Sequence, residues 1–275
     1  NKLVKHSRSV ASKLSGGVAY LMQKNNIKVI DGTATVADKC RLDVTHKGVV
    51  TQYRSNHIIL ATGARARNLP NIEIDGDLVW GAREAMTPTA LPGSLLVIGG
   101  GAIGVEFASL YNDLGTDVTL VEAAERITPA EDAEISSLAE RSFKQRGIKV
   151  LTNSVVNFVE GAGEQALAYI KGPSGEHQLK FDQVILAVGI QGNIEGLGLK
   201  SLGVKTEHSF LIADPFGKTN LAGLYAIGDV AGAPWLAHKA SHEAIVCVEK
   251  IAGIEGIEPL NKDRGPGCTY CRPQI

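Results

Sequence analysis

The sequence has few cysteines, few aromatic residues, no long hydrophobic run and no excess of either charge. Its four cysteines are too few for a disulfide scaffold and favour a reducing compartment. No apolar segment approaches the roughly 20 residues that span a bilayer, so we expect no membrane partner. The net charge of −1 comes from 28 basic and 29 acidic residues, mixed along the chain, which gives no basic footprint for nucleic acid. A hydrophobic fraction of 44% in 275 residues suffices for two domains.

The stretch from Leu95 to Glu122 has the pattern of a complete dinucleotide-binding unit. An apolar strand leads into Gly99, Gly101 and Gly104, which form G-x-G-x-x-G at the start of a helix. The three glycines permit, in turn, a tight turn, close approach of the backbone to a pyrophosphate, and close packing of helix on strand. The free N–H groups from Gly101 to Gly104 and the positive end of the helix dipole then face an anion.

The residues after the glycine turn support the same interpretation. The helix register predicts one apolar face made of Ile103, Phe107, Leu110, Tyr111 and Leu114. Gly115 ends the helix, and the next strand ends at Glu122, roughly 20 residues after the turn, where a carboxylate accepts hydrogen bonds from adenosine ribose hydroxyls. The same carboxylate repels a 2′-phosphate, so we expect NAD rather than NADP. An ordinary strand-helix-strand unit with no ligand is the alternative.

Glycine and proline segments divide the chain into three regions. The first has a helix expected at 10–25, weakened at Gly16-Gly17, and a small antiparallel meander with strands at 28–34, 41–45, 49–53 and 57–61. A proline-punctuated connector places a domain boundary near Pro88. The second region adds a helix at 131–146 and strands at 149–151, 155–160, 166–171, 178–181 and 183–188, and the third adds a strand at 224–227 and a helix at 237–252. This alternation predicts an α/β protein with at least one parallel sheet.

Four motifs together resemble the pyridine nucleotide-disulfide oxidoreductase family of flavoproteins, and within it the dihydrolipoamide dehydrogenases. Residues 58–64 match the family's ATG segment beside the flavin nucleotide, and residues 97–106 match the G-x-G-x-x-G-x-E of its NAD domain. Residues 224–229 match its second flavin motif, in which an aspartate holds the ribityl chain. Residues 236–240 resemble the helix start that approaches the isoalloxazine ring.

The resemblance implies a Rossmann-like NAD-binding domain, with a parallel sheet and an antiparallel meander, inserted in a partial FAD-binding domain. It assigns residues 1–87 and 215–262 to the flavin part, 88–214 to the NAD domain, and 263–275 to the start of a dimerisation domain. NAD is then expected to contact Gly99, Gly101, Ala102, Ile103, Gly104, Glu106, Glu122 and Gly189, with Glu106 near the nicotinamide. FAD is expected to contact Gly32, Ala34, Thr62, Gly63, Gly228, Asp229, Leu236, Ala237 and His238.

The sequence departs from the family at both ends. It contains neither the flavin-binding G-x-G-x-x-G nor the C-x-x-x-x-C pair with which family members begin, and it stops at Ile275, before their catalytic His-Glu pair. We therefore expect an internal fragment, and we assign it no catalytic residue. Cys268 and Cys271 form a C-x-x-C, and His238 and His242 are one helical turn apart, but neither pair has further partners at ligand spacing, so we expect no metal site.

The complete parent is expected to be a homodimeric enzyme that reoxidises dihydrolipoyl groups of a 2-oxoacid dehydrogenase complex, with FAD and NAD as cofactors. Its compartment is expected to be the cytoplasm or, alternatively, the mitochondrial matrix. Mercuric reductases and transhydrogenases share the same motifs, and a nucleotide-binding module without turnover is a further alternative. For the chain itself we expect no lipoamide reduction, weak or no FAD binding, and autonomous folding of the segment from Pro88 to Asp214.

Overall fold

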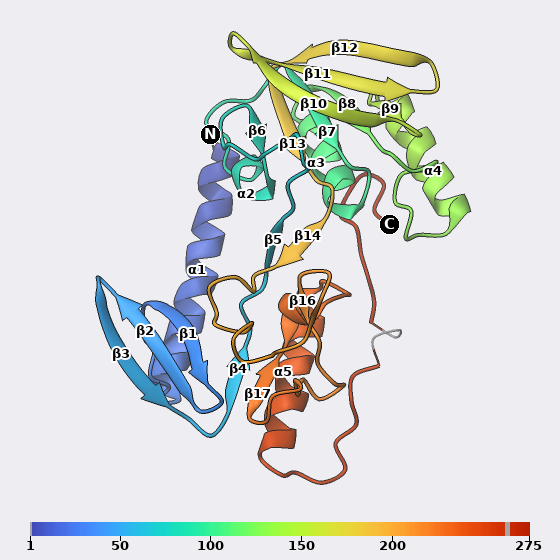
Figure 1. Ribbon diagram of the computed structural model, residues 1–275. Helices are drawn as coiled ribbons and strands as arrows, with labels where there is room; N and C mark the ends of the chain where they lie inside the picture. The colour runs from blue at the N-terminus through green and yellow to red at the C-terminus, as the bar shows by residue number, and fades with distance from the viewer. Residues whose placement is uncertain (1, 262–264) are drawn as a thin grey trace. The chain divides into compact units, whose positions relative to one another are not determined.

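The structure, a computed structural model, describes residues 2–261 and 265–275 (Figure 1). The chain divides into two compact units. Unit 1 comprises Asn1–Ser15, Ala66–Gly189 and Cys268–Ile275, and unit 2 comprises Gly16–Arg65 and Ile190–Gly267. Among the described residues there is no helix with the length and apolar character needed to span a membrane.

Unit 1 is built on a five-stranded parallel sheet. The strand order is β6 (Val79–Trp80), β13 (Gln183–Leu186), β7 (Ser94–Ile98), β8 (Asp117–Val121) and β9 (Lys149–Leu151). The inner strands are almost entirely buried and mostly apolar because both faces of the sheet are covered. The short helix α2 (Ala82–Ala85) follows β6.

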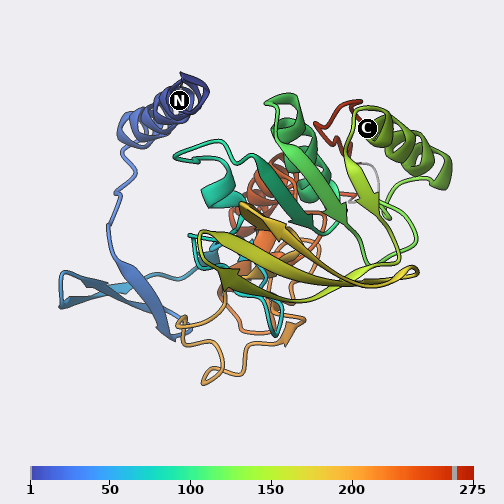
Figure 2. The same cartoon turned by 90° about the horizontal axis from the view of Figure 1, so that it is seen from above.

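Successive residues of β7 enter two different cores, as the alternation of side chains along a strand requires. Leu95 and Val97 pack against α3 (Ala102–Asp113) and α4 (Ala133–Gln145). Leu96 and Ile98 pack against an antiparallel meander, formed by β10 (Val155–Ala162), β11 (Gln165–Gly172) and β12 (Gly175–Phe181). Figure 2 shows the two helices on one side of the sheet and the meander on the other. The expected parallel sheet with a meander is therefore confirmed.

The buried face of α3 differs from the face expected from its sequence. Phe107 and Tyr111 are buried as expected, but Ile103, Leu110 and Leu114 are 38%, 41% and 42% exposed. The helix instead buries its small residues, Gly104, Val105 and Ala108. The reason is the close approach of the helix to β7, which only small side chains permit, so the line of contact shifts toward them.

Unit 2 begins with an antiparallel sheet of β1 (Thr33–Asp38), β2 (Arg41–His46) and β3 (Val49–Arg54). The segment at 57–61 was expected to be the fourth strand of this meander, and that expectation is wrong. Instead, β4 (Ile58–Leu60) pairs in parallel with β17 (Leu224–Ala226). The two strands contribute to one apolar core. Its formation pairs segments 166 residues apart in the sequence and overrides the local strand pattern. The first strand also begins at Thr33, later than the expected 28–34.

The remaining elements of unit 2 are short apart from one helix. A 3-10 turn, η1 (Gly228–Ala231), follows β17 and leads to α5 (Ala237–Ile251). The other strand pairs are β5 (Ala64–Ala66) with β14 (Ile190–Gly192), and β15 (Thr206–Glu207) with β16 (Phe210–Leu211).

Other boundaries also differ from those expected. Helix α1 (Lys2–Lys24) starts earlier than residue 10 and continues through Gly16-Gly17. The central segment of unit 1 begins at Ala66 rather than near Pro88, and it includes β6, which forms the edge of the sheet by pairing with β13. Residues 268–275 also belong to unit 1, whereas the boundary expected between 262 and 263 lies outside the described residues.

Candidate functional site

A cleft of about 380 Å³ opens in unit 1 beyond the carboxyl ends of β7, β8 and β13. Ligands of open α/β sheets bind at these strand ends. Gly99 and Gly101 line it from the glycine turn, Glu122 from the end of β8, and Gly189 from the end of β13. These four residues, all expected from the sequence, are brought together in one cavity.

The glycines of the turn carry different steric constraints. Gly99 has φ +105°, and a Cβ there would lie 2.3 Å from the carbonyl oxygen of Ala187. A Cβ at Gly104 would lie 1.8 Å from the carbonyl oxygen of Gly99, so this residue sets the packing of helix on strand. Gly101 precedes the first turn of α3 with φ −73° and ψ −178°, and a Cβ there would meet no atom within 4 Å. Space is therefore open where a pyrophosphate is expected to approach.

The carboxylate of Glu122 is held in place by backbone donors. Its Oε2 accepts a hydrogen bond from the Gly100 N–H at 2.5 Å, and its Oε1 accepts from the Ala124 N–H at 2.7 Å. Each carboxylate oxygen has a second lone pair, so both remain able to accept from ribose hydroxyls. The nearby cation is engaged elsewhere, because Arg126 pairs with Glu125 at 3.2 Å.

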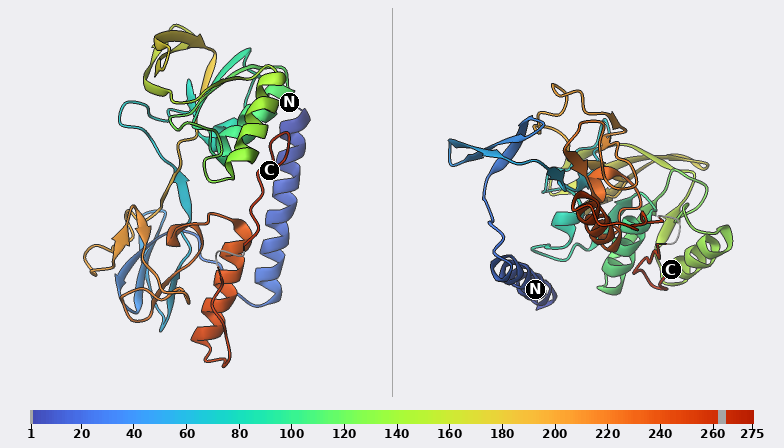
Figure 3. Two further views of the ribbon diagram at one scale, coloured as in Figure 1. Left: turned by 90° about the vertical axis from the view of Figure 1, so that its right-hand side faces the viewer. Right: turned by 90° about the horizontal axis from the view of Figure 1, so that it is seen from below.

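Glu106 does not line the cleft, although the sequence places it near the nicotinamide. Its Oε1 accepts a hydrogen bond from the backbone N–H of Tyr270 at 2.7 Å. One turn further along α3, Ser109 Oγ accepts from the N–H of Arg272 at 3.0 Å. The C-terminal segment therefore lies along α3, as Figure 3 shows. Ala102 and Ile103, at the exposed start of α3, also lie outside the cleft lining.

The flavin motifs of unit 2 meet at one sheet edge. Because β4 and β17 are parallel and in register, the segments that follow them emerge side by side. Thr62 and Gly63 follow β4, and Gly228 and Asp229 follow β17. This edge has the geometry of a ligand site at strand ends, like the cleft of unit 1.

A buried ion pair holds the turn that carries Asp229. Lys239 is 2% exposed, and its Nζ donates to the carbonyl oxygens of Gly228 at 3.0 Å and Gly232 at 2.8 Å. Its Nζ also lies 3.2 Å from Oε2 of Glu243, and the same oxygen accepts the Gly228 N–H at 2.8 Å. Both ends of the turn are thereby fixed to α5. In the sequence this buried ion pair is visible only as a Lys and a Glu four residues apart, a spacing that is common on solvated helix faces and does not indicate burial.

The remaining flavin-side residues fall into two groups. Leu236 caps α5, and Ala237 and His238 form its exposed first turn. Gly32 and Ala34 lie against β2 instead. Gly32 has φ +153°, and a Cβ there would lie 2.6 Å from Val44 Cγ1, so packing requires the glycine.

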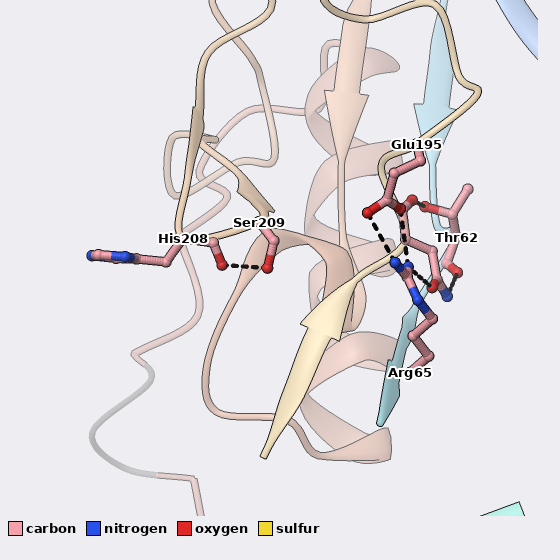
Figure 4. A network of polar contacts seen from close by, with 6 residues as sticks. Thr62, Arg65, Glu195, His208 and Ser209 are labelled. Atoms are coloured by element: carbon pink, nitrogen blue, oxygen red, sulfur yellow. Dashed lines mark hydrogen bonds and ion pairs between the residues drawn. The ribbon is translucent and has the colours of Figure 1, made fainter. Parts of the chain in front are cut away.

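The Thr62-Gly63 turn is fixed by a polar network (Figure 4). Thr62 Oγ1 donates to the carbonyl oxygen of Asn193 at 2.8 Å, and the Asn193 amide donates back to the carbonyl oxygen of Thr62 at 2.9 Å. Arg65 donates to Asn193 Oδ1 at 2.8 Å and binds both carboxylate oxygens of Glu195 at 2.9 Å. The hydrogen bonds from Arg65 lower the pKa of Glu195 to about 2.

We expect Arg65→Met to return the pKa of Glu195 to the ordinary carboxyl range, near about 4.3. The folded pKa is depressed, so the stability that this carboxylate contributes is present above about pH 4.3 and lost as the pH falls toward about 2. A carbon-13 NMR titration of the glutamate carboxyls measures the shift, with Arg83→Met in unit 1 as the control. An unchanged Glu195 pKa in Arg65→Met would contradict this assignment.

The cysteine and histidine pairs show no metal geometry. In the part of the chain that the structure describes, no group of three or more His, Cys, Asp or Glu side chains is placed to hold a metal ion. Cys268 is exposed, but Cys271 is buried and donates from Sγ to the carbonyl oxygen of Pro273 at 3.0 Å. Burial raises the pKa of the Cys271 thiol, which disfavours the reactive thiolate.

Known proteins similar to this chain belong to the family that its motifs resemble. The profile of the pyridine nucleotide-disulphide oxidoreductase family matches residues 2–244. The chain is 48% identical to a dihydrolipoyl dehydrogenase of Rhizobium etli, over 99% of this chain and 60% of that protein. It is 45% identical to one of Zymomonas mobilis, over 100% of this chain and 59% of that protein. The crystal structure of LpdA from Mycobacterium tuberculosis matches 99% of this chain and 60% of that chain, with TM-score 0.91 and 27% identity. The chain thus spans about 60% of the length of these relatives.

Proposed function

We propose that this chain, which belongs to the pyridine nucleotide-disulphide oxidoreductase family, serves the reaction of a dihydrolipoyl dehydrogenase. In that reaction electrons pass from dihydrolipoyl groups through FAD to NAD. The observation that carries the proposal is the cleft in which the glycine turn and the anchored carboxylate of Glu122 lie together. The identity of 48% and 45% to two dihydrolipoyl dehydrogenases supports this reaction within the family.

The residues of unit 1 fit a dinucleotide. The open space at Gly101 admits a pyrophosphate next to the free N–H groups of the first turn of α3. Glu122 accepts hydrogen bonds from the adenosine ribose, and its two backbone donors orient it before the ligand arrives. The protein therefore binds and orients the nucleotide, while the bound cofactors supply hydride and electron transfer.

The residues of unit 2 fit the ribityl chain of a flavin. Asp229 accepts hydrogen bonds from ribityl hydroxyls, and the Lys239 contacts fix the turn that carries it. The Arg65 network fixes the Thr62-Gly63 turn that emerges beside it. This reaction implies two partners for the complete protein: the dihydrolipoyl domain of a 2-oxoacid dehydrogenase complex, and a second copy of the protein. The proposed compartment is the cytoplasm.

The proposal is tested by titrating the purified chain with NADH and with FAD in a calorimeter. We expect NADH to bind with one site per chain, because the cleft of unit 1 is drawn from that unit alone. An absence of NADH binding by a folded chain would overturn the proposed function. The colour of the purified protein is a second measurement. We expect a colourless protein, because this chain is expected to bind FAD weakly or not at all, whereas bound FAD would make it yellow.

We expect the chain to bind NADH about 100-fold more tightly than NADPH, which corresponds to about 2.7 kcal/mol. The fixed carboxylate of Glu122 repels the 2′-phosphate, and Arg126 is held by Glu125. Glu122→Gln is expected to narrow the ratio to about tenfold by removing the charge. Calorimetric titration with both nucleotides measures the ratio, with Glu164→Gln, at an exposed position in the turn between β10 and β11, as the control. Tighter binding of NADPH by the unmodified chain would refute the prediction.

A further inference from the structure

One cation lines the nucleotide cleft from outside every motif in the sequence. Arg67 follows β5, and its backbone N–H donates to the carbonyl oxygen of Gly189 at 3.1 Å. Its Nη2 donates to the carbonyl oxygen of Val188 at 2.9 Å. Among the described residues that line the cleft, Arg67 is the one basic side chain and Glu122 the one acidic side chain. The guanidinium is thus attached to the segment after β13, on the exposed wall of the cleft where an anionic ligand is proposed to bind.

The strand order determines which half of a bound dinucleotide lies at each end of the cleft. In the sheet β7 lies between β8 and β13, so Glu122 and Val188 are on opposite sides of the glycine turn. A dinucleotide with its adenosine ribose on Glu122 and its pyrophosphate at Gly101 extends its second nucleotide toward the end of β13. That is where Arg67 is attached. The nicotinamide half of the ligand, rather than the adenosine half, is therefore brought to the guanidinium.

The guanidinium of Arg67 has N–H donors and a positive charge available to bind an anionic ligand. Of its five N–H donors, the structure uses one, toward Val188. No carboxylate of the described residues lies within 4.0 Å of Arg67, in contrast to Arg65 and Arg126, which are both paired. The anchored geometry reduces the entropy that the side chain loses when it meets a ligand. Hydrogen bonds from a guanidinium to a phosphate are among the strong ones.

We propose that Arg67 binds the phosphate on the nicotinamide side of the dinucleotide. The assignment rests on the proposed nucleotide-binding function of the cleft. Arg67 is a binding residue of unit 1, and its hydrogen bond to Val188 keeps the guanidinium at the nicotinamide end of the site. The contact is a charge-assisted hydrogen bond to a partly exposed phosphate, so it weakens as salt screens the two charges.

The test measures dissociation constants of three ligands for the purified chain: NADH, ADP-ribose and AMP. Arg67→Gln removes the charge and shortens the side chain, whereas Arg67→Lys keeps the charge. We expect Arg67→Gln to weaken the binding of NADH and of ADP-ribose about tenfold, as the loss of a charged hydrogen bond does. The dissociation constant of AMP is expected to change less than about twofold. AMP lacks the second phosphate and ribose. Arg83→Gln, on α2 of the same unit, is the matched control and is expected to change none of the three.

Salt dependence separates an ionic contact from a structural role. Between about 50 and 500 mM salt, NADH binding by the unmodified chain is expected to weaken more steeply than binding by Arg67→Gln, and Arg67→Lys to keep part of the slope. Equal slopes, unchanged NADH affinity in Arg67→Gln, or an equal loss of AMP affinity would each overturn the assignment to the nicotinamide-side phosphate. If the unmodified chain binds no NADH, the proposed function itself fails, and this assignment fails with it.

Discussion

Gly104→Ala is expected to destabilise unit 1 by about 3 kcal/mol and to abolish NADH binding, whereas Gly101→Ala is expected to abolish binding alone. The two residues stand three positions apart in one motif, yet their surroundings differ. A methyl group at Gly104 would lie 1.8 Å from the carbonyl oxygen of Gly99, which is backbone and cannot move aside without displacing β7 or α3. A methyl group at Gly101 meets no protein atom within 4 Å.

Gly101→Ala acts on the ligand and not on the fold. Its backbone, with φ −73°, suits alanine, so the stability of unit 1 is expected to change by less than about 0.5 kcal/mol. The added methyl group occupies the space through which the pyrophosphate approaches, and we expect NADH to bind at least about 100-fold more weakly, a loss of about 2.7 kcal/mol. Gly99→Ala is expected to resemble Gly104→Ala, because its φ of +105° and a contact of 2.3 Å with Ala187 both oppose a side chain.

Thermal unfolding followed by tryptophan fluorescence distinguishes the two effects, and NADH titration completes the test. Trp80 is buried in unit 1, with its ring 6.5 Å from that of Tyr111, and reports on that unit. Gly115→Ala is an unsuitable control because its φ is +97°. Gly161→Ala, in β10 of unit 1, is suitable because its added methyl group would lie at an ordinary 3.5 Å from Leu78. A Gly104→Ala chain as stable as the original, or a Gly101→Ala chain that binds NADH normally, would contradict the roles assigned to these glycines.

The nucleotide half of the site could be predicted from the sequence because its determinants are local. Gly99, Gly101, Gly104 and Glu122 lie within one strand-helix-strand segment. Within it, Gly104 packs against the carbonyl oxygen of Gly99, and Glu122 accepts from the Gly100 N–H. Arg67 is different. It reaches the cleft from a segment before the motif and is held by backbone atoms after β13, so no periodicity or spacing indicates it.

The same distinction explains the errors in the fold. The lengths and positions of most strands follow from local alternation, but the partners of β4 and β6 do not. β4 pairs with β17, from the third region of the sequence. β6 pairs with β13, which places residues before Pro88 in the central segment of unit 1, Ala66–Gly189. The helical spacing of large apolar residues predicts the wrong buried face of α3, because the short distance between α3 and β7 admits only small residues at the contact.

Lys239→Met is expected to destabilise unit 2 by about 3–5 kcal/mol, as loss of one partner of a buried ion pair does. The substitution removes three contacts of Nζ at once: those to Gly228, Gly232 and Glu243. The side chain of Glu243 is 11% exposed, so water can solvate its carboxylate only slightly once the lysine cation is removed. The two carbonyl oxygens lose their buried donor as well, and their desolvation adds to the cost.

The control is Lys250→Met, the same substitution at an exposed position of the same helix. It removes a contact between Lys250 and the ring of Phe216, 4.7 Å from the centroid, and is expected to cost at most about 1 kcal/mol. A double variant, Lys239→Met with Glu243→Leu, removes the buried carboxylate too and is expected to recover part of the stability. It does not restore the contacts to the turn, because Gly228 N–H and both carbonyl oxygens still lack partners from α5.

Each unit has its own reporter for this test. Trp235 belongs to unit 2, with its ring 5.5 Å from that of Phe210, and Trp80 belongs to unit 1. In a Trp80→Phe background, Lys239→Met is expected to lower the unfolding temperature reported by Trp235 by about 10 °C or more. NADH affinity, which depends on unit 1, is expected to stay within about twofold. An unfolding temperature equal to that of Lys250→Met would show that the turn carrying Asp229 is held without the lysine, and the Lys239 contacts would then not be what orients the flavin-side carboxylate.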